Sequence, residues 1–142
     1  MTLDPMEFLD LSTKLFIDKN YEKEAKYRTC TSRAYYAAHL FTKEKLEKLG
    51  FAFPIEKDER KGVIHDKVIV ALMSLKEKDK ITWGRRKEKK LWQRLKDLRD
   101  RRGDADYILN INFRNMEDSV RLDITAADDI IKKVDKLTIS DF

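Results

Sequence analysis

The sequence predicts an all-α protein, an up-and-down bundle of four to five helices with a short β-hairpin before the last helix. Three observations predict this class. Apolar residues recur at spacings of three and four along most of the chain. Apolar residues make up 42% and charged residues 40% of the sequence, which is typical of helices with a narrow core stripe and charged outer faces. The length of 142 residues suits one domain, residues 1–142, with a single core.

The first two helices are predicted over residues 5–18 and 21–49. Asp4 is the expected N-cap of the first helix, with Pro5 at the first helical position. Gly50 is expected to end the second, long helix. Small residues on the inward face of this helix let another helix approach closely, which predicts a place at the centre of the bundle or at a dimer seam. These residues are Ala34, Ala37 and Ala38.

The middle of the chain predicts a surface loop over residues 50–61 and two more helices, over residues 63–78 and 83–102. The loop contains Pro54 and a stretch of mixed charge. The third helix has a broad apolar stripe, so we expect it to be well buried. Its stripe consists of Ile64, Val68, Ala71, Leu72 and Leu75.

After Tyr107 the apolar period changes from that of a helix to that of a strand. Alternating apolar and polar residues over 109–113 and 120–124 predict a β-hairpin. Helix remains an alternative, because residues 120–134 also carry a stripe at heptad-like spacing. Thr125 is the predicted N-cap of a last helix that begins at Ala126.

Arg102 stands where the apolar stripe of the fourth helix predicts an apolar residue, in register with Leu91, Leu95 and Leu98. A buried cation is costly unless it is paired, so either nearby carboxylates satisfy it or it lines a pocket that accepts an anion. Gly103 is expected to end the helix and to let the next residues fold back over the arginine. The nearest carboxylates are those of Asp104 and Asp106.

Positive charge is concentrated in one segment. Residues 76–102 hold 13 lysines and arginines against five acidic residues, whereas the whole chain has a net charge of only +5. Such a segment attracts phosphates, although a solvated helix face is the competing interpretation. The candidate phosphate-binding residues are Lys90, Arg94, Arg99 and Arg101.

The sequence argues against a membrane-spanning, a secreted, a disulfide-bonded and a metal-binding protein. The chain has no apolar run long enough to span a membrane and no basic stretch followed by an apolar one at its start, so we expect a cytoplasmic protein. Cys30 has no second cysteine to pair with. The two histidines, His39 and His65, lack carboxylates at ligand spacing, so neither a metal nor a cofactor is expected.

Two motifs together resemble the HEPN domain. The first is Ser-Arg-Ala-Tyr-Tyr-Ala-Ala-His at residues 32–39, and the second is the segment R-x-x-A-D-Y at residues 102–107. The chain looks most like the small stand-alone prokaryotic branch of that family, and the likeness covers about residues 6–137. The resemblance implies a helical bundle that is usually dimeric, with the arginine motifs of two chains facing each other.

Many HEPN proteins are metal-independent endoribonucleases, and many are toxins paired with a nucleotidyltransferase-like antitoxin. They use an arginine followed within a few residues by a histidine, and this chain instead has Tyr107, Ile108 and Leu109 at the eligible positions. The resemblance therefore implies catalytic roles for Arg102 and Tyr107, the latter as an acid or hydrogen-bond donor because a phenol is a poor base at neutral pH. Arg33 and Tyr36 share one helical face and are expected to support this segment.

Two functions follow as expectations. One is a HEPN-like protein of a toxin-antitoxin or defence module that binds RNA and cleaves it without metal. The other is a non-catalytic dimeric module that binds a nucleotidyltransferase-like partner or a nucleotide, which the missing histidine favours.

Overall fold

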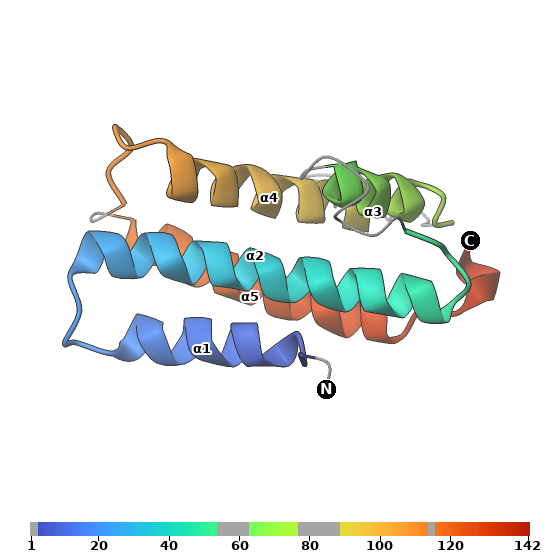
Figure 1. Ribbon diagram of the computed structural model, residues 1–142, viewed down its shortest axis with the longest axis horizontal. Coiled ribbons are helices and arrows are strands. Elements are labelled where there is room, and N and C mark those ends of the chain that lie inside the picture. Colours follow the sequence, from blue (N-terminus) through green and yellow to red (C-terminus); the bar gives the residue numbers. More distant parts are fainter. Residues whose placement is uncertain (1–2, 54–62, 77–88, 114–115) are drawn as a thin grey trace, which may run out of the picture.

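The computed structural model describes residues 3–53, 63–76, 89–113 and 116–142. Within these ranges the chain forms five α-helices, one short 3-10 helix and no strand (Figure 1). The prediction of an all-helical bundle is confirmed. The elements are α1 (Met6–Ile17), α2 (Lys23–Lys48), α3 (Val63–Met73), α4 (Leu91–Tyr107), α5 (Glu117–Asp135) and η2 (Ile139–Asp141).

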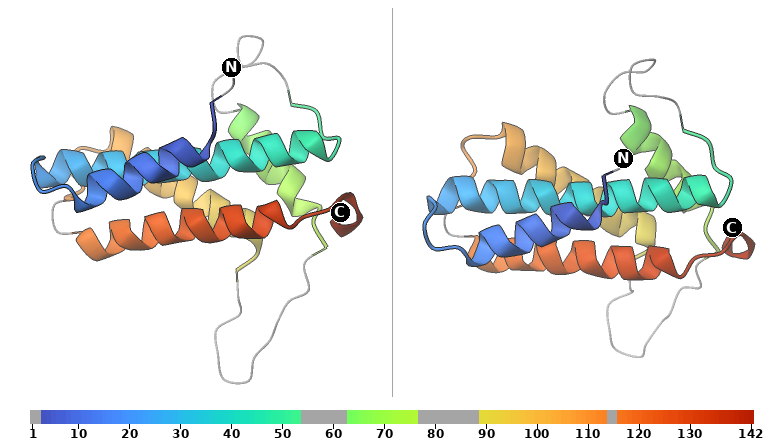
Figure 2. Two further views of the ribbon diagram at one scale, coloured as in Figure 1. Left: turned by 90° about the horizontal axis from the view of Figure 1, so that it is seen from below. Right: turned by 60° about the horizontal axis from the view of Figure 1, so that its bottom comes forward.

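The long helix α2 is the centre of the bundle and contacts α1, α3, α4 and α5. In Figure 1, α1 lies along one side of α2, whereas α3 and α4 lie along the other. The chain colours show that α1 and α4 run opposite to α2 and α5. The views in Figure 2 show α3 crossing the bundle at an angle, near the C-terminal half of α2.

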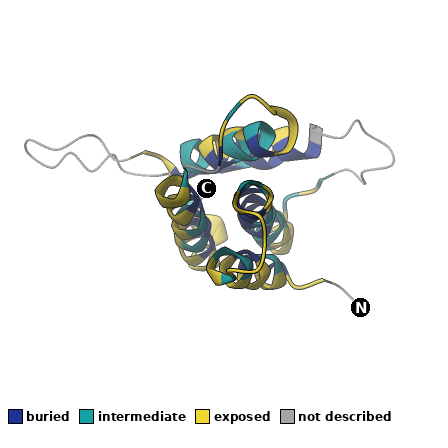
Figure 3. Cartoon of the chain, turned by 90° about the vertical axis from the view of Figure 1, so that its left-hand side faces the viewer, coloured by how far each residue is buried: buried dark blue, intermediate teal, exposed yellow. Residues whose placement is uncertain are grey.

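Small residues explain why so many helices meet on α2. Ala34, Ala37 and Ala38 have no exposed surface, as their spacing predicts for a central helix. Larger side chains from the neighbouring helices fill the space around them, among them Leu95 of α4 and Ile130 of α5. Figure 3, which looks along the bundle, shows the buried residues turned inward and the exposed ones outward.

The predicted β-hairpin is not seen among the described residues. α4 continues to Tyr107, and α5 runs from Glu117 to Asp135, so the helix alternative for residues 120–134 is confirmed. In the connection between the helices, the carbonyl oxygens of Leu109 and Ile111 accept hydrogen bonds from the Arg28 guanidinium instead of from a neighbouring strand. Phe113, buried under the end of the bundle, anchors this connection.

The prediction that Thr125 caps the last helix is also wrong. Thr125 lies inside α5, and its Oγ1 donates to the carbonyl oxygen of Arg121 one turn earlier, a bond that threonine commonly makes within helices. The apolar residues spaced by three and four from Val120 onward form the buried face of α5, and Val120 itself has no exposed surface.

Gly103 does not end α4, contrary to the prediction. It lies inside the helix, and among the described residues only Gly50 has a positive φ, at 105°. The helix can continue because Arg28 donates to the carbonyl oxygens of Asp104 at 3.2 Å and of Ala105 at 2.8 Å. A long-range side chain thus satisfies the end of the helix, a role that sequence reasoning assigned to a glycine.

Other boundaries differ less. α3 ends at Met73, five residues before its predicted end, and α1 and α2 match their predicted ranges to within two residues. The predicted start of the fourth helix at Trp83 lies outside the described residues, as does most of the predicted 50–61 loop. Among the described helices, none combines the length and the apolar character that crossing a bilayer requires.

The position of Gly103 within a helix generates a stability test. A Cβ added at Gly103 meets no atom within 4 Å, so we expect Gly103→Ala to raise the free energy of unfolding by about 0.5–1 kcal/mol, because alanine has the higher helix propensity. The matched variant Gly50→Ala should lower it by about 1 kcal/mol, since alanine is strained at a positive φ. Urea unfolding measures both changes, and destabilisation by Gly103→Ala would contradict the helical assignment.

Candidate functional site

Arg102 lies on the face of α4 that turns toward α2, and its side chain is only 13% exposed. Three tyrosine rings surround the guanidinium. Its central carbon lies 5.3 Å from the ring centroid of Tyr35, 5.6 Å from that of Tyr36 and 6.0 Å from that of Tyr107. These distances are within the range in which a cation is attracted to an aromatic ring.

Among the described residues, the Arg102 guanidinium has few acceptors for its N–H groups. Its nearest carboxylate is that of Asp106, where Nη1 and Oδ2 are 3.7 Å apart, which is beyond hydrogen-bond distance. That same carboxylate oxygen accepts a hydrogen bond from Ser32 Oγ at 3.2 Å. Buried Nε of Arg102 has no acceptor among the described residues. A guanidinium that has unsatisfied N–H donors and little contact with water is suited to bind an anion.

Two further arginines lie around the same rings. The Arg33 guanidinium stands over Tyr36 at 4.9 Å and over Phe8 of α1 at 5.5 Å. Arg99, one turn before Arg102, forms an ion pair with Asp66 of α3. The structure therefore brings together most of the predicted site, around the face of α2 that packs against α3 and α4, with Phe8 of α1 at its edge.

Arg101 and Asp104 are predicted site residues that the structure places elsewhere. The Arg101 guanidinium faces α5, where Nη2 donates to Asp123 Oδ2 at 2.9 Å and Nε donates to the same oxygen at 3.2 Å. Thr31 Oγ1 also donates to this oxygen, at 2.9 Å. Two of the Arg101 nitrogens are thus paired with Asp123, so this arginine holds α4 against α5. Asp104 contributes a backbone carbonyl to Arg28.

Lys90 and Arg94 lie at the start of α4, far from Arg102. Arg94 is eight residues before Arg102, about 12 Å along the helix axis. The exposed amide of Lys90 donates to Gln93 Oε1 at the first turn. These two cations therefore lie more than two helical turns from Arg102 and not within its site. Of the other basic residues of this segment, Lys89 and Lys96 form ion pairs with Asp97 and Asp100, whereas Arg85, Arg86 and Lys87 lie outside the described residues.

A stack of three buried rings beside Arg102 is the part that sequence reasoning missed. The imidazole of His39 lies flat on that of His65, with centroids 4.0 Å apart, and Tyr35 stacks on both at 5.6 Å. A hydrogen bond of 2.5 Å joins the Tyr35 hydroxyl to His65 Nδ1. The only sequence signal was Tyr35 and His39 at i and i+4, because His65 belongs to another helix.

Both histidines are neutral at physiological pH. Burial, and then the positive charges of Arg99 and Arg102, lower the pKa of His65 to about 4. Burial, followed by His65, Lys43 and the same two arginines, lowers the pKa of His39 to about 3. Burial raises the pKa of Tyr35, so its phenol stays protonated. The stack therefore places a neutral imidazole, not a charged one, beside the arginines.

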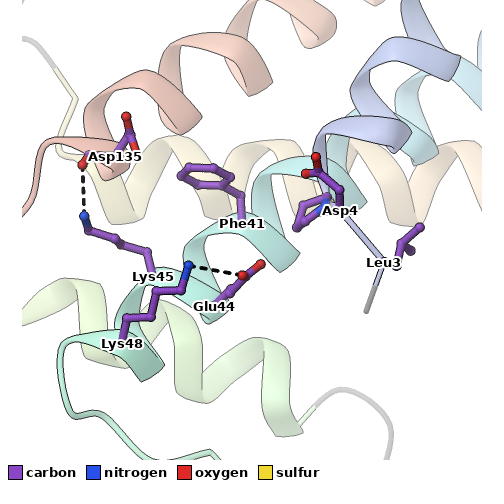
Figure 4. Close-up of a pocket in the computed structure, with 8 residues that line it drawn as sticks. Leu3, Asp4, Phe41, Glu44, Lys45, Lys48 and Asp135 are labelled. Atoms are coloured by element: carbon purple, nitrogen blue, oxygen red, sulfur yellow. Dashed lines mark hydrogen bonds and ion pairs between the residues drawn. The ribbon is translucent and has the colours of Figure 1, made fainter. Parts of the chain in front are cut away.

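The described residues give no support for a metal centre, since within them no three histidine, cysteine or acidic side chains are placed to hold an ion. A depression at the other end of α2 contains none of the predicted site residues (Figure 4). Its two lysines already have partners, because Lys45 donates to the carbonyl oxygen of Asp135 at 2.9 Å and Lys48 pairs with Glu44 at 3.3 Å. It is lined by Leu3, Asp4, Pro5, Phe41, Glu44, Lys45, Lys48 and Asp135.

Comparison of the chain with protein-family models, with curated protein sequences and with solved structures finds no match. The resemblance to the HEPN family therefore rests on the two motifs themselves. Their key side chains, Arg33 and Tyr36 of the first motif and Arg102 and Tyr107 of the second, lie in one cluster.

The neutral histidine stack generates a pH test. An unfolded histidine is protonated below about pH 6.5, whereas the folded stack resists protonation until about pH 4, so stability is full above pH 6.5 and falls as the pH drops. At pH 5 we expect the two histidines together to have lowered the protein's free energy of unfolding by about 2–4 kcal/mol.

The variant His39→Phe is the control for this test, because Nδ1 of His39 has no partner to lose. Its free energy of unfolding should fall about half as steeply between pH 6.5 and pH 5, since one of the two groups no longer titrates. Urea unfolding at several pH values measures the slopes. Equal slopes in the wild type and the variant would show that His39 is not held neutral.

Proposed function

We propose that this protein binds RNA through a phosphate group at Arg102, as a HEPN-like member of a toxin-antitoxin or defence module. One observation carries the proposal, which is that the Arg102 guanidinium has a buried Nε without an acceptor and a carboxylate partner no nearer than 3.7 Å. A phosphate can accept two parallel hydrogen bonds from a guanidinium, which supplies what this group lacks.

The surroundings favour an RNA phosphate over a small carboxylate. Arg33 and Arg99 lie within reach of the same rings, so several positive charges converge on one place. The basic residues at the start of the same helix, Lys90 and Arg94, add a sequence-independent attraction to a polyanion. The resemblance to the HEPN family names RNA as the polyanion.

Metal-independent cleavage is a second candidate, and His65 is the observation that favours it. In this reaction the RNA 2'-oxygen attacks phosphorus, the bond from phosphorus to the 5'-oxygen breaks, one proton leaves the 2'-hydroxyl and another reaches the leaving 5'-oxygen. Arg102 is suited to stabilise the extra charge on phosphorus. In the tautomer whose Nδ1–H donates to the Tyr35 oxygen, His65 Nε2 has the free lone pair that a base needs.

The non-catalytic alternative is retained as an outcome of the experiments. A homodimer and a nucleotidyltransferase-like partner stay predictions from the resemblance. If the protein binds RNA and never cleaves it, Arg102 serves recognition alone.

The binding proposal is tested with Arg102→Ala. Because charged hydrogen bonds contribute about 1.5–3 kcal/mol, we expect RNA affinity to fall about 10- to 150-fold. Arg102→Lys should recover little of this loss, since a lysine cannot donate two parallel hydrogen bonds. Arg121→Ala removes an exposed arginine on α5 and is the matched control, with no expected effect. Fluorescence anisotropy with labelled RNA measures the affinities, and unchanged binding by Arg102→Ala would refute the proposal.

Cleavage is tested by incubating RNA with the protein in EDTA and examining the products for 2',3'-cyclic phosphate ends. If His65 is the base, His65→Gln lowers the cleavage rate about 100- to 10,000-fold and leaves RNA affinity unchanged. His39→Gln changes the other histidine of the stack and controls for its disturbance. Equal activity of the two variants would exclude a special role for His65, and an inactive wild type that still binds RNA would favour the non-catalytic module.

A further inference from the structure

Tyr107 combines high exposure with a fixed position. It is the last residue of α4, and it is 75% exposed. The Arg28 guanidinium donates to carbonyl oxygens on both sides of it, to Ala105 at 2.8 Å and to Ile111 at 2.5 Å. Arg28 is itself held by an ion pair with Glu24 at 3.2 Å. The backbone that carries this ring is therefore braced by a side chain from α2.

The Tyr107 ring lies next to the cation that we assign to phosphate. The Arg102 guanidinium carbon is 6.0 Å from the ring centroid, a separation short enough for one nucleotide to contact both. Tyr36, by contrast, already has guanidinium groups at 4.9 Å and 5.6 Å, from Arg33 and Arg102. Of the tyrosines around Arg102, Tyr107 is the exposed one, whereas Tyr35 has no exposed surface and Tyr36 is half-buried.

We propose that the Tyr107 ring stacks on an unpaired base whose phosphate is bound at Arg102, so that this site takes single-stranded RNA. The inference rests on the proposed function and adds the class of substrate. In a duplex each base is stacked between its neighbours and its faces are not available, whereas in a single strand a base can turn out onto an aromatic side chain. This role belongs to the ring of Tyr107 and does not need its hydroxyl group.

The decisive comparison is between Tyr107→Phe and Tyr107→Leu, because phenylalanine keeps the ring and leucine removes it. Stacking on an aromatic ring changes affinity for single-stranded RNA about 5- to 150-fold, so we expect that loss in Tyr107→Leu and near wild-type binding in Tyr107→Phe. Tyr21→Leu changes a tyrosine that is 59% exposed outside this cluster, and it is the matched control. Urea unfolding of each variant checks that the fold is kept.

Three RNA probes complete the experiment: a short unstructured strand, the same strand without bases, and a blunt duplex. The wild type should bind the unstructured strand best, and Tyr107→Leu should bind the strand without bases as well as the wild type does. A strand that contains 2-aminopurine should lose fluorescence on binding to the wild type and to Tyr107→Phe, but not to Tyr107→Leu.

The possible failures can be told apart. Equal losses in Tyr107→Phe and Tyr107→Leu would assign the effect to the hydroxyl group and overturn the stacking inference. Binding that needs Arg102 but is the same for duplex and single strand, and indifferent to Tyr107, would also overturn it while leaving the proposed function intact. Binding that is absent, or that does not depend on Arg102, would refute both.

Discussion

The placement of a guanidinium on the core side of α4 is the constraint on which the candidate site depends. Arg102 occupies a position in line with buried leucines, so its charge is taken largely out of water. Several kcal/mol of lost hydration must be offset, and the neighbours do this only in part. Tyrosine rings supply a weak attraction, and Asp106 stands 3.7 Å away while also accepting from Ser32. The fold thus retains a cation whose N–H groups are not all paired within the described residues, which is the physical basis for proposing that it binds an anion.

Arg101 and Arg102, although adjacent on α4, face different helices because a helix turns by about 100° per residue. Arg101 points toward α5, where Asp123 accepts hydrogen bonds from two of its nitrogens and a third from Thr31. Arg102 points toward α2 and the tyrosines. Arg28 of α2 performs a third task by holding the backbone after α4. Positive charge in this protein therefore stabilises the fold at one side of α4 and remains available for a ligand at the other.

His65 supplies in space the kind of side chain that the second motif lacks in sequence, which is a histidine near the arginine. Many HEPN proteins have their histidine shortly after the arginine in the chain, where this protein has Tyr107. Here a neutral imidazole lies near Arg102 in space, because α3 places His65 against the tyrosines of α2. A neutral imidazole and a cation in one cluster are two of the groups that the proposed cleavage uses. An exposed aromatic ring beside them is suited to stack on an unpaired nucleobase. The proposed RNA binding, cleavage and base stacking thus concern separate side chains and can be separated by substitution.

By itself the sequence determined the helical class, the close packing at the alanines of α2, and the unusual position of Arg102, because each follows from the local pattern of apolar and small residues. It could not decide the segment after Tyr107, where strand and helix periods both fitted. It also could not predict that Gly103 continues a helix or that Arg101 pairs with Asp123. Those outcomes depend on partners far away in the chain, such as Arg28, 76 residues before Asp104, and Asp123, 22 residues after Arg101. Only the tertiary structure brings such side chains within hydrogen-bond distance, and the same is true of His39 and His65, which come from different helices.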